Sequence, residues 1–333
     1  MLSNKTQHDS DAGLIRVTAP ARLHLGFLGL DGADQGRFGS IGVGITGFST
    51  TLVASRSAHV VVQGDDTGHV AGVTQALLDH YRIDTGLKVR VEHSIPRHQG
   101  LGSGTQLALA LGTAISALYG LNASVEDLAI ATGRGRRSGV GLGVFRHGGF
   151  IVDSGRSPGQ ALPTTVLRHD FPAPWRLVLV LDPQARGLSG ATERKAFKTL
   201  PELPTEVGAA LCQQVLMQLL PALLEQDCDR FGAAVTNMQA HLGACFSAAQ
   251  GGVYASDKVR QALEFLAQRY ATGIGQTSWG PTGFAIFPDH DRARQAVEAL
   301  AREGVEVKLV SVGAQNNGAS KAPLTGTSKH RRF

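Results

Sequence analysis

The chain has 333 residues, of which 42% are hydrophobic, 6% aromatic and 18% charged, and its formal net charge is +5. This length can bury one large core or two medium ones. The sparse aromatic residues form no ladder with basic ones, which argues against nucleic acid as the partner. An anionic small substrate explains the positive excess equally well, because many arginines lie near glycine-rich turns.

The two ends of the chain have the composition of unstructured segments. Residues 1–13 are polar and lack the apolar stretch of a signal peptide, and residues 313–333 are polar and basic. We therefore expect both segments to be disordered. No apolar run approaches the length of a membrane span, so we expect a cytoplasmic protein without a membrane partner.

The first half of the chain predicts mainly strands. Alternating or continuous apolar residues predict strands at 14–27, 50–62, 87–93 and 149–153. Helical spacing, and a capping-box pattern at Ser124, predict helices at 73–81, 107–118 and 124–132. Glycine-rich loops are expected at 29–47 and 133–149, the second with four arginines. A proline-containing loop at 154–174 places the domain boundary there, with domains at 14–172 and 173–312.

The second half predicts helices between strands. The expected strands are 175–181, 284–287 and 305–312, and the expected helices are 191–199, 205–224, 227–242, 256–270 and 290–302. This order lacks the regular alternation of strand and helix found in a doubly wound sheet. It therefore argues against a Rossmann or P-loop fold and favours an α+β protein.

The stretch from Ile95 to Leu118 combines a glycine-rich turn, 100–105, with an amphipathic helix. Free backbone N–H groups and the positive end of the helix dipole make such a turn suitable for phosphate. The lysine of a Walker motif is missing, because Gly104 is followed by Thr105 and Gln106. A plain loop before a core helix is the alternative interpretation.

Three segments together resemble the GHMP superfamily of small-molecule kinases. Pro96–Gly104 resembles its phosphate loop, P-x-x-x-G-L-G-S-[SG]; Ala19–Gly26 resembles its first motif; and Gly273–Gly283 occupies the place of its third. The resemblance implies an α+β fold of two domains. The N-terminal domain would be a mixed sheet with helices, like domain 2 of ribosomal protein S5, and the C-terminal domain would be ferredoxin-like.

Departures from the kinase pattern point to one branch of that superfamily. The central acid of the kinases is missing after Ser138-Gly139, and the next acid is Asp153. The segments that resemble the β-ribofuranosylaminobenzene 5′-phosphate synthases are Arg134–Gly141, Gly148–Gly155, Gly187–Gly190 with Glu193, and Gly275–Thr282.

This resemblance implies a Mg²⁺-dependent transferase in tetrahydromethanopterin biosynthesis, and family habit suggests a homodimer. It would condense 5-phosphoribosyl 1-diphosphate with 4-aminobenzoate or a close analogue and release CO₂ and diphosphate. The alternatives are a GHMP-type ATP-dependent kinase for a small molecule and, in another class, a non-catalytic protein that binds nucleotides or nucleic acid.

The chemistry selects candidate residues, since arginine binds phosphate and carboxylate in bidentate fashion. The catalytic candidates are Arg22, His24, Arg134, Arg137 and Asp153. The phosphate or diphosphate ligands would be Arg97, Gly100, Leu101, Gly102, Ser103, Gly104, Thr105, Arg136 and Ser138. The substrate-binding candidates are Gln276, Thr277, Ser278, Glu193 and Trp279, which could stack on an aryl ring. The candidate metal ligands are Asp153 and Asp182, although aspartates at strand ends also form turns.

Overall fold

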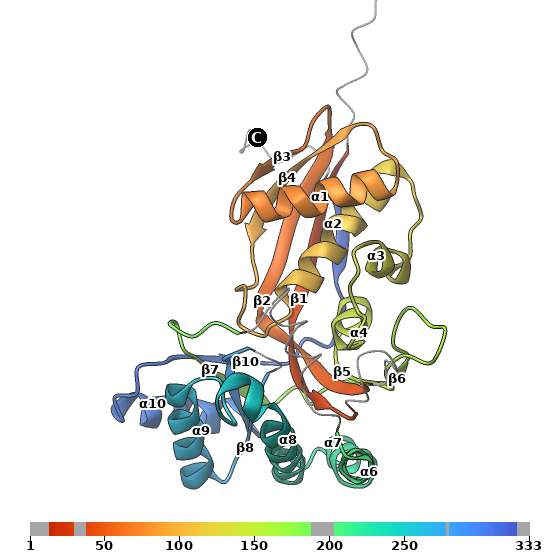
Figure 1. Ribbon diagram of the computed structural model, residues 1–333. Helices are drawn as coiled ribbons and strands as arrows, with labels where there is room; N and C mark the ends of the chain where they lie inside the picture. The colour runs from red at the N-terminus through yellow and green to blue at the C-terminus, as the bar shows by residue number, and fades with distance from the viewer. Residues whose placement is uncertain (1–12, 30–37, 188–202, 278–279, 325–333) are drawn as a thin grey trace, which may run out of the picture.

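The computed structural model describes residues 13–29, 38–187, 203–277 and 280–324. The first of its two sheets has the order β11-β1-β2-β4-β3, and β5 pairs with both β2 and β6. Its strands are β1 (Leu14–Phe27), β2 (Ser40–Ser57), β3 (Val61–Gln63), β4 (Gly86–His93), β5 (Phe150–Asp153), β6 (Thr165–His169) and β11 (Ser320–Leu324). The long strands β1 and β2 of this sheet extend toward the second domain (Figure 1).

Helices pack on this sheet around one core. They are α1 (Thr67–His80), α2 (Ser103–Tyr119), α3 (Val125–Ala131) and α4 (Val140–His147). The core joins Val17 and Leu52 of the sheet to Leu109 and Ile115 of α2. The predicted capping box of α3 is confirmed, because the side chains and backbone N–H groups of Ser124 and Asp127 bond reciprocally.

The second sheet is antiparallel, with the order β10-β7-β9-β8. Its strands are β7 (Arg176–Leu181), β8 (Gly273–Gln276), β9 (Gly283–Phe287) and β10 (Lys308–Val312). Its helices are α6 (Thr205–Gln214), a π-helical turn η1 (Val215–Leu219), α7 (Leu220–Leu224), α8 (Cys228–Gln250), α9 (Asp257–Tyr270) and α10 (His290–Arg302). The path β7, helices, β8, β9, α10, β10 is the ferredoxin-like arrangement that was expected.

Strand β7 separates two cores because its side chains alternate between the faces of the sheet. Val178 and Val180 pack against α9 and α10. Leu177, Leu179 and Leu181 belong to a larger core, which also contains side chains from residues 21–27 of β1, from residues 41–45 of β2 and from α8. This larger core joins the two domains. Strands β6 and β7 belong to different sheets, so the chain passes from the first sheet to the second between them.

The glycine-rich segments differ most from the sequence prediction. Residues 40–47, expected in a loop, form the first half of β2, and α4 lies within the segment 133–149. The reason is close packing: a Cβ at Gly42 would lie 2.5 Å from both the Leu23 carbonyl oxygen and a Val140 methyl group. Glycine there permits the approach of a strand and a helix. The structure also adds β6 and β8 to the predicted strands.

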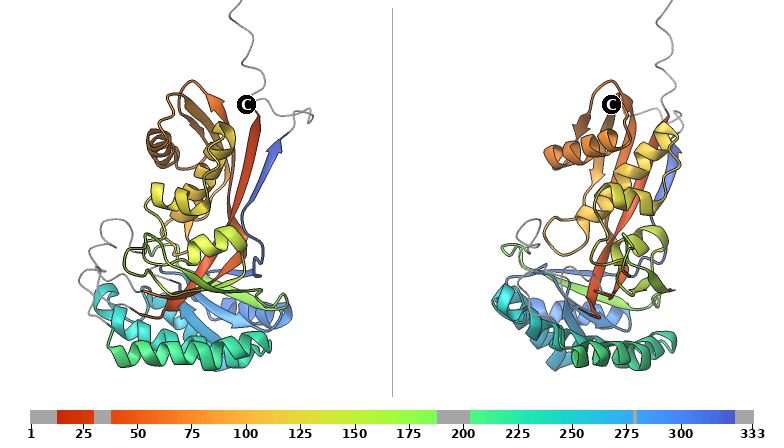
Figure 2. Two further views of the ribbon diagram at one scale, coloured as in Figure 1. Left: turned by 90° about the vertical axis from the view of Figure 1, so that its right-hand side faces the viewer. Right: turned by 45° about the vertical axis from the view of Figure 1, so that its right-hand side comes forward.

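The prediction of a disordered tail from 313 onward is wrong for residues 313–324. Strand β11 pairs with β1 from Leu14↔Leu324 to Thr18↔Ser320, and Ala314 forms a bridge to Ile45. Figure 2 shows β11, in blue, beside β1. The backbone groups at the edge of β1 need partners, and the returning chain provides them. Residues 1–12 and 325–333, and the helix expected at 191–199, lie outside the described residues.

The helical stretch Thr205–Leu224 contradicts the expectation that no apolar run approaches the length of a membrane span. By length and composition it could cross a membrane, since an 18-residue window has a mean hydropathy of 1.6. In the fold it lies along the second domain (Figure 2). Leu211, Val215 and Leu219 pack into the larger core. Its apolar character therefore has a packing role on this face.

Candidate active site

Segments from three distant parts of the chain meet at the start of α2. The hydroxyl of Thr277 accepts a hydrogen bond from the N–H of His24 in β1 (2.8 Å) and donates one to the carbonyl of Gly100 (3.0 Å). Gly280 lies against the same loop, because a Cβ there would be 2.5 Å from the carbonyl carbon of Gln99. The fold thus brings the three motif segments into contact.

The loop has the geometry of an anion site. Gly100 and Gly102 have positive φ angles of 75° and 86°, which let the chain turn into α2 at Ser103. Leu101 between them is buried, and its carbonyl accepts from the N–H of Arg22 (3.1 Å). The N–H groups of Ser103 and Gly104 precede the first acceptor of α2 and lie at the positive end of its dipole, whereas the N–H of Thr105 donates to the Gly102 carbonyl (3.1 Å).

Two arginines from other segments lie beside this turn. The guanidinium of Arg22 donates to the carbonyl of Gly100, and its central carbon is 3.4 Å from where a Cβ at Gly102 would be. Nη1 of Arg134 is 3.2 Å from where a Cβ at Gly104 would be. Glycine at both positions leaves the guanidinium groups close to the helix N-terminus. The turn therefore combines two cations with backbone donors, a strong arrangement for binding anions.

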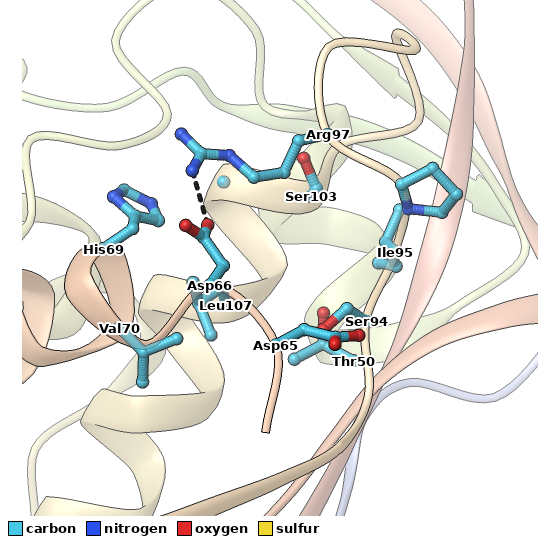
Figure 3. Close-up of a pocket in the computed structure, with 12 residues that line it drawn as sticks. Thr50, Asp65, Asp66, His69, Val70, Ser94, Ile95, Arg97, Ser103 and Leu107 are labelled. Carbon is cyan, nitrogen blue, oxygen red and sulfur yellow. Dashed lines mark hydrogen bonds and ion pairs between the residues drawn. The ribbon is translucent and has the colours of Figure 1, made fainter. Parts of the chain in front are cut away.

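A cavity of about 370 Å³ lies beside the loop (Figure 3). Its lining includes Ser103 and Gly104 from α2, and Asp65, Asp66 and His69 from the start of α1; the remaining residues are Thr50, Val70, Ser94, Ile95, Pro96, Arg97 and Leu107. In Figure 3, Arg97 reaches toward Asp66, with which it forms an ion pair. Burial, followed by the charge of Arg97, lowers the pKa of His69. The volume is within the range of small-molecule sites.

Comparison with known proteins places this geometry in a family. The family model described as GHMP kinases N terminal domain matches residues 68–145, and the model described as GHMP kinases C terminal matches 219–306. A β-ribofuranosylphenol 5′-phosphate synthase of Archaeoglobus fulgidus is 31% identical over 92% of this chain and 98% of its own. The chain belongs to the GHMP kinase superfamily, in the branch of these synthases.

Two further similarities agree with this GHMP assignment. A synthase of the same name from Methanothermobacter thermautotrophicus is 29% identical over 91% of this chain and 97% of its own. The solved structure of MDDEF in complex with MVAPP, AMPPCP and magnesium has a TM-score of 0.67 at 17% identity. It covers 94% of this chain and 99% of that chain, and at this identity it shows the fold alone. The expected GHMP fold is confirmed.

Asp153 is the first acidic residue after Ser138-Gly139, where the GHMP kinase acid is missing. It packs against the arginine-bearing segment 133–149. It is fully buried, and its oxygens accept from the N–H groups of Gly139 and Gly155 (both 2.9 Å) and from the hydroxyl of Ser40. Burial raises the pKa of Asp153, and these hydrogen bonds oppose that rise. The Ser40 hydroxyl also bonds to that of Ser138 (2.7 Å). This geometry makes Asp153 an internal support of the segment.

Asp182, the other predicted metal ligand of this GHMP chain, follows β7. Its carboxylate accepts from the hydroxyl of Ser256 (2.7 Å) and from the N–H of Gln184 (2.9 Å). Burial tends to raise the pKa of Asp182, but the bonds from Ser256 and Gln184 lower it below its usual value. Within the described ranges, no group of three His, Cys, Asp or Glu residues could hold a metal. Asp153 and Asp182, engaged in internal bonds, do not fit a magnesium site.

The remaining predicted residues are distributed unevenly. Thr105 follows the loop in the first turn of α2. Arg136 is exposed and Arg137 is half-buried. The Gln276 side chain accepts from the N–H of Ala255 (2.7 Å). Ser278, Trp279 and Glu193 lie outside the described residues.

Sequence reasoning missed most of the polar lining of the cavity. Thr50, Asp65, Asp66 and His69 lie in none of the recognised GHMP motifs and come together only in the fold. The one available signal was the acidic pair 65–66 directly before a helix, a common arrangement with no functional meaning by itself.

Proposed function

We propose that this protein condenses 5-phosphoribosyl 1-diphosphate with a 4-substituted benzoate and releases CO₂ and diphosphate. The names of the curated relatives specify a phenol product, so 4-hydroxybenzoate is tested beside the 4-aminobenzoate implied by the motif resemblance. The absence of an acid directly after Ser138-Gly139 supports this reaction. Its acceptor is a ring carbon, and no alcohol has to be deprotonated.

The observation that carries the proposal is the position of Arg22 and Arg134 at the start of α2. Their guanidinium groups lie beside Gly102 and Gly104, where backbone N–H groups also converge. A leaving diphosphate concentrates negative charge, and fixed donors and cations placed where that charge develops lower the barrier. Arginine at both positions suits a substrate pair that brings diphosphate and carboxylate to one place.

The cavity beside the loop suits the phosphoribosyl donor. Ser103 and Gly104 form its wall at the phosphate loop, and Asp65 and Asp66 lie farther along the lining. Carboxylates accept hydrogen bonds from ribose hydroxyls, whereas the loop and Arg97 bind phosphate oxygens.

The reaction then balances without an added reagent. The bond between the anomeric carbon and diphosphate breaks, and diphosphate leaves with the electron pair. The ring carbon that bears the carboxylate forms the new carbon–carbon bond to the anomeric carbon. The bond to the carboxylate breaks next, CO₂ leaves, and its electron pair restores the aromatic ring. The protein orients the two substrates and stabilises the anions.

Magnesium enters this proposal with the substrate, since the described residues offer no carboxylate cluster for it. Mg²⁺ commonly binds through substrate phosphates and retains several waters. No step of the reaction above is assigned to it.

An ATP-dependent small-molecule kinase is the second candidate, because kinases give the matched family its name. The two functions are separated by supplying 5-phosphoribosyl 1-diphosphate with benzoates labelled with ¹⁴C in the carboxyl group. Labelled CO₂ is expected with 4-hydroxybenzoate or 4-aminobenzoate. Absence of CO₂ release, together with phosphorylation of an alcohol by ATP, would overturn the synthase proposal.

Two arginine variants sharpen this test. Arg134→Ala should lower the rate of CO₂ release by roughly 100-fold or more, the usual effect of removing a preorganised donor to a developing anion. Arg146→Ala is the matched control, because Arg146 forms an ion pair with Glu126 on α3. An equal loss in both variants would indicate that general positive charge, and not the loop site, supports the reaction.

A further inference from the structure

A second, much smaller cavity lies between β1 and α8. Its volume is about 30 Å³, enough for one or two water molecules or the tip of a ligand. The walls that matter are His24 and Phe27 of β1, Gln239 and Phe246 of α8, and Gln276 of β8. The rings of His24 and Phe27 are 4.4 Å apart, and Phe27 also contacts Phe246 edge-on. The cavity is therefore a niche lined by the rings of Phe27 and Phe246 and by three polar side chains, those of His24, Gln239 and Gln276.

One of those polar groups has no partner among the described residues. His24 is 2% exposed, and its Nε2 makes no hydrogen bond there. The amides beside it are engaged: Gln239 donates to the Leu25 carbonyl (2.6 Å) and accepts from the N–H of Gln276 (3.0 Å). The Gln276 side chain accepts from Ala255. Buried polar atoms are rarely left unpaired, so Nε2 marks a place for a ligand or a water.

Burial, followed by the charge of Arg22, lowers the pKa of His24 to about 3. The imidazole is consequently neutral at physiological pH, and one of its nitrogens is a hydrogen-bond acceptor. A neutral acceptor in a buried niche suits a hydroxyl group and does not suit a second anion.

The spacing along β1 relates this niche to the anion site. Arg22 and His24 are two residues apart and lie on the same face of the strand, opposite Leu23. Two residues of strand cover about 7 Å, comparable with a benzoate from its carboxylate to its 4-substituent. A benzoate whose carboxylate lies at Arg22 thus extends its opposite end toward His24.

We propose that the niche receives the 4-substituent of the benzoate, with Nε2 of His24 as its hydrogen-bond partner, and that this contact selects acceptors with a donor group at that position. The inference rests on the proposed function. A 4-hydroxyl group, more acidic than a 4-amino group, forms the stronger bond. Benzoate itself leaves Nε2 unpaired, and a site built for a hydroxyl discriminates strongly against a ligand without one.

The same contact assists the chemistry. When the ring carbon bonds to the anomeric carbon, positive charge develops on the ring and is shared by the oxygen of the 4-hydroxyl. The O–H then donates more strongly to Nε2, and the bond relaxes when CO₂ leaves and the ring becomes aromatic again. No proton is transferred overall, so the neutral imidazole stabilises the intermediate without titrating.

The test measures binding and turnover separately. Calorimetry with 4-hydroxybenzoate and benzoate, in the presence of diphosphate, should show at least 10-fold tighter binding of 4-hydroxybenzoate to the wild type. His24→Phe should abolish this preference. His24→Gln, whose amide reaches the place of Nε2, should keep most of it, and His24→Asn, whose amide reaches only Nδ1, should not. Thermal unfolding verifies that each variant is folded.

A second measurement observes His24 in the wild type directly. The ¹⁵N shift of the His24 Nε2, assigned by its loss in His24→Gln, should move with 4-hydroxybenzoate and not with benzoate. If the wild type releases CO₂ but His24→Phe keeps the preference, or if the shift is unchanged, the inference is overturned and the synthase function stands. If the wild type neither binds nor turns over any benzoate, the proposed function fails first.

Discussion

Gly280 provides a direct test of how the third motif positions the phosphate loop. A Cβ at this position would lie 2.5 Å from the carbonyl carbon of Gln99 and closer still to the N and Cα atoms of Gly100. These are backbone atoms, which cannot rotate away. Ordinary contacts between carbon atoms are about 3.5 Å or longer, so Gly280→Ala forces the two segments apart by about 1 Å.

The displacement falls on the loop that we propose binds the anion. A misplacement of about 1 Å in a positioning group can cost roughly 100-fold in rate, and overpacking of this kind costs about 1–3 kcal/mol of stability. Gly280→Ala should therefore lower CO₂ release about 100-fold while the protein remains folded at 25 °C. The assay is the rate with labelled 4-hydroxybenzoate, accompanied by urea unfolding of the same preparation.

Gly72→Ala in α1 is the matched control. A Cβ at Gly72 meets no atom within 4 Å, and alanine stabilises a helix interior by about 0.5–1 kcal/mol relative to glycine. This control should unfold at a slightly higher urea concentration with unchanged activity. If Gly280→Ala retained activity within twofold of the wild type, close backbone contact would not be what positions the loop.

Three further predictions concern stability. Asp153→Asn should lower the free energy of unfolding by about 2 kcal/mol, because the amide leaves a buried donor unpaired. Since burial raises the folded pKa of Asp153, the folded state binds the proton more tightly than the unfolded state. Urea melts should therefore show the wild type gaining stability over the variant as pH falls from 7 toward 4. Ser256→Ala removes the N-cap of α9 and a partner of Asp182, and it should lower the free energy of unfolding by about 1–2 kcal/mol. Because the folded pKa of Asp182 is lowered, the stability that this carboxylate contributes is lost as pH falls. Thermal melts should therefore show the variant losing less stability on acidification than the wild type. Truncation after residue 312 removes β11, so a lower melting temperature and self-association through the open edge of β1 are expected by size-exclusion chromatography; truncation after 324 is the control, and equal behaviour of the two would contradict the pairing.

Elements with a strong local period could be predicted from sequence. Helix α10 has the expected bounds, 290–302, and β4 differs from its prediction by one residue. In both, the pattern of apolar side chains reports directly which face is buried. The capping box at Ser124 is equally local, because all its hydrogen bonds lie within four residues.

Glycine-rich segments could not be predicted in the same way. Glycine favours loops by local propensity, but at Gly42 and Gly44 its role is to admit a neighbouring helix or chain segment. At Gly44 the close neighbour is the carbonyl oxygen of Gln315, a residue far away in sequence. Likewise, the sequence of β11, Ser-Lys-Ala-Pro-Leu, is short and contains a proline, and it becomes a strand by pairing with the edge of β1. Such decisions depend on contacts that no window of sequence contains.

The candidate site shows the same division. The glycine turn at 100–105 is recognisable from sequence as a candidate phosphate site because its chemistry is local. Tertiary packing places Arg22 and Arg134 beside this turn. It also buries Asp153, whose carboxylate bonds to the backbone of the arginine-bearing segment. Resemblance supplied candidate residues, whereas only the fold assigns partners to them.

Strand β1 explains why the two halves of the site lie where they do. Its register with β2 shifts after Pro20, which has no N–H to donate to a ladder. Beyond the shift, Arg22 reaches the loop and His24 reaches the niche against α8, while Thr277 bonds to the backbone of both β1 and the loop. Both proposed sites thus use strand β1, so the spacing between Arg22 and His24 is set by strand geometry, whereas the opposite wall of the niche belongs to α8. A change that slides β1 relative to α8 should therefore alter which benzoate binds before it alters phosphate binding.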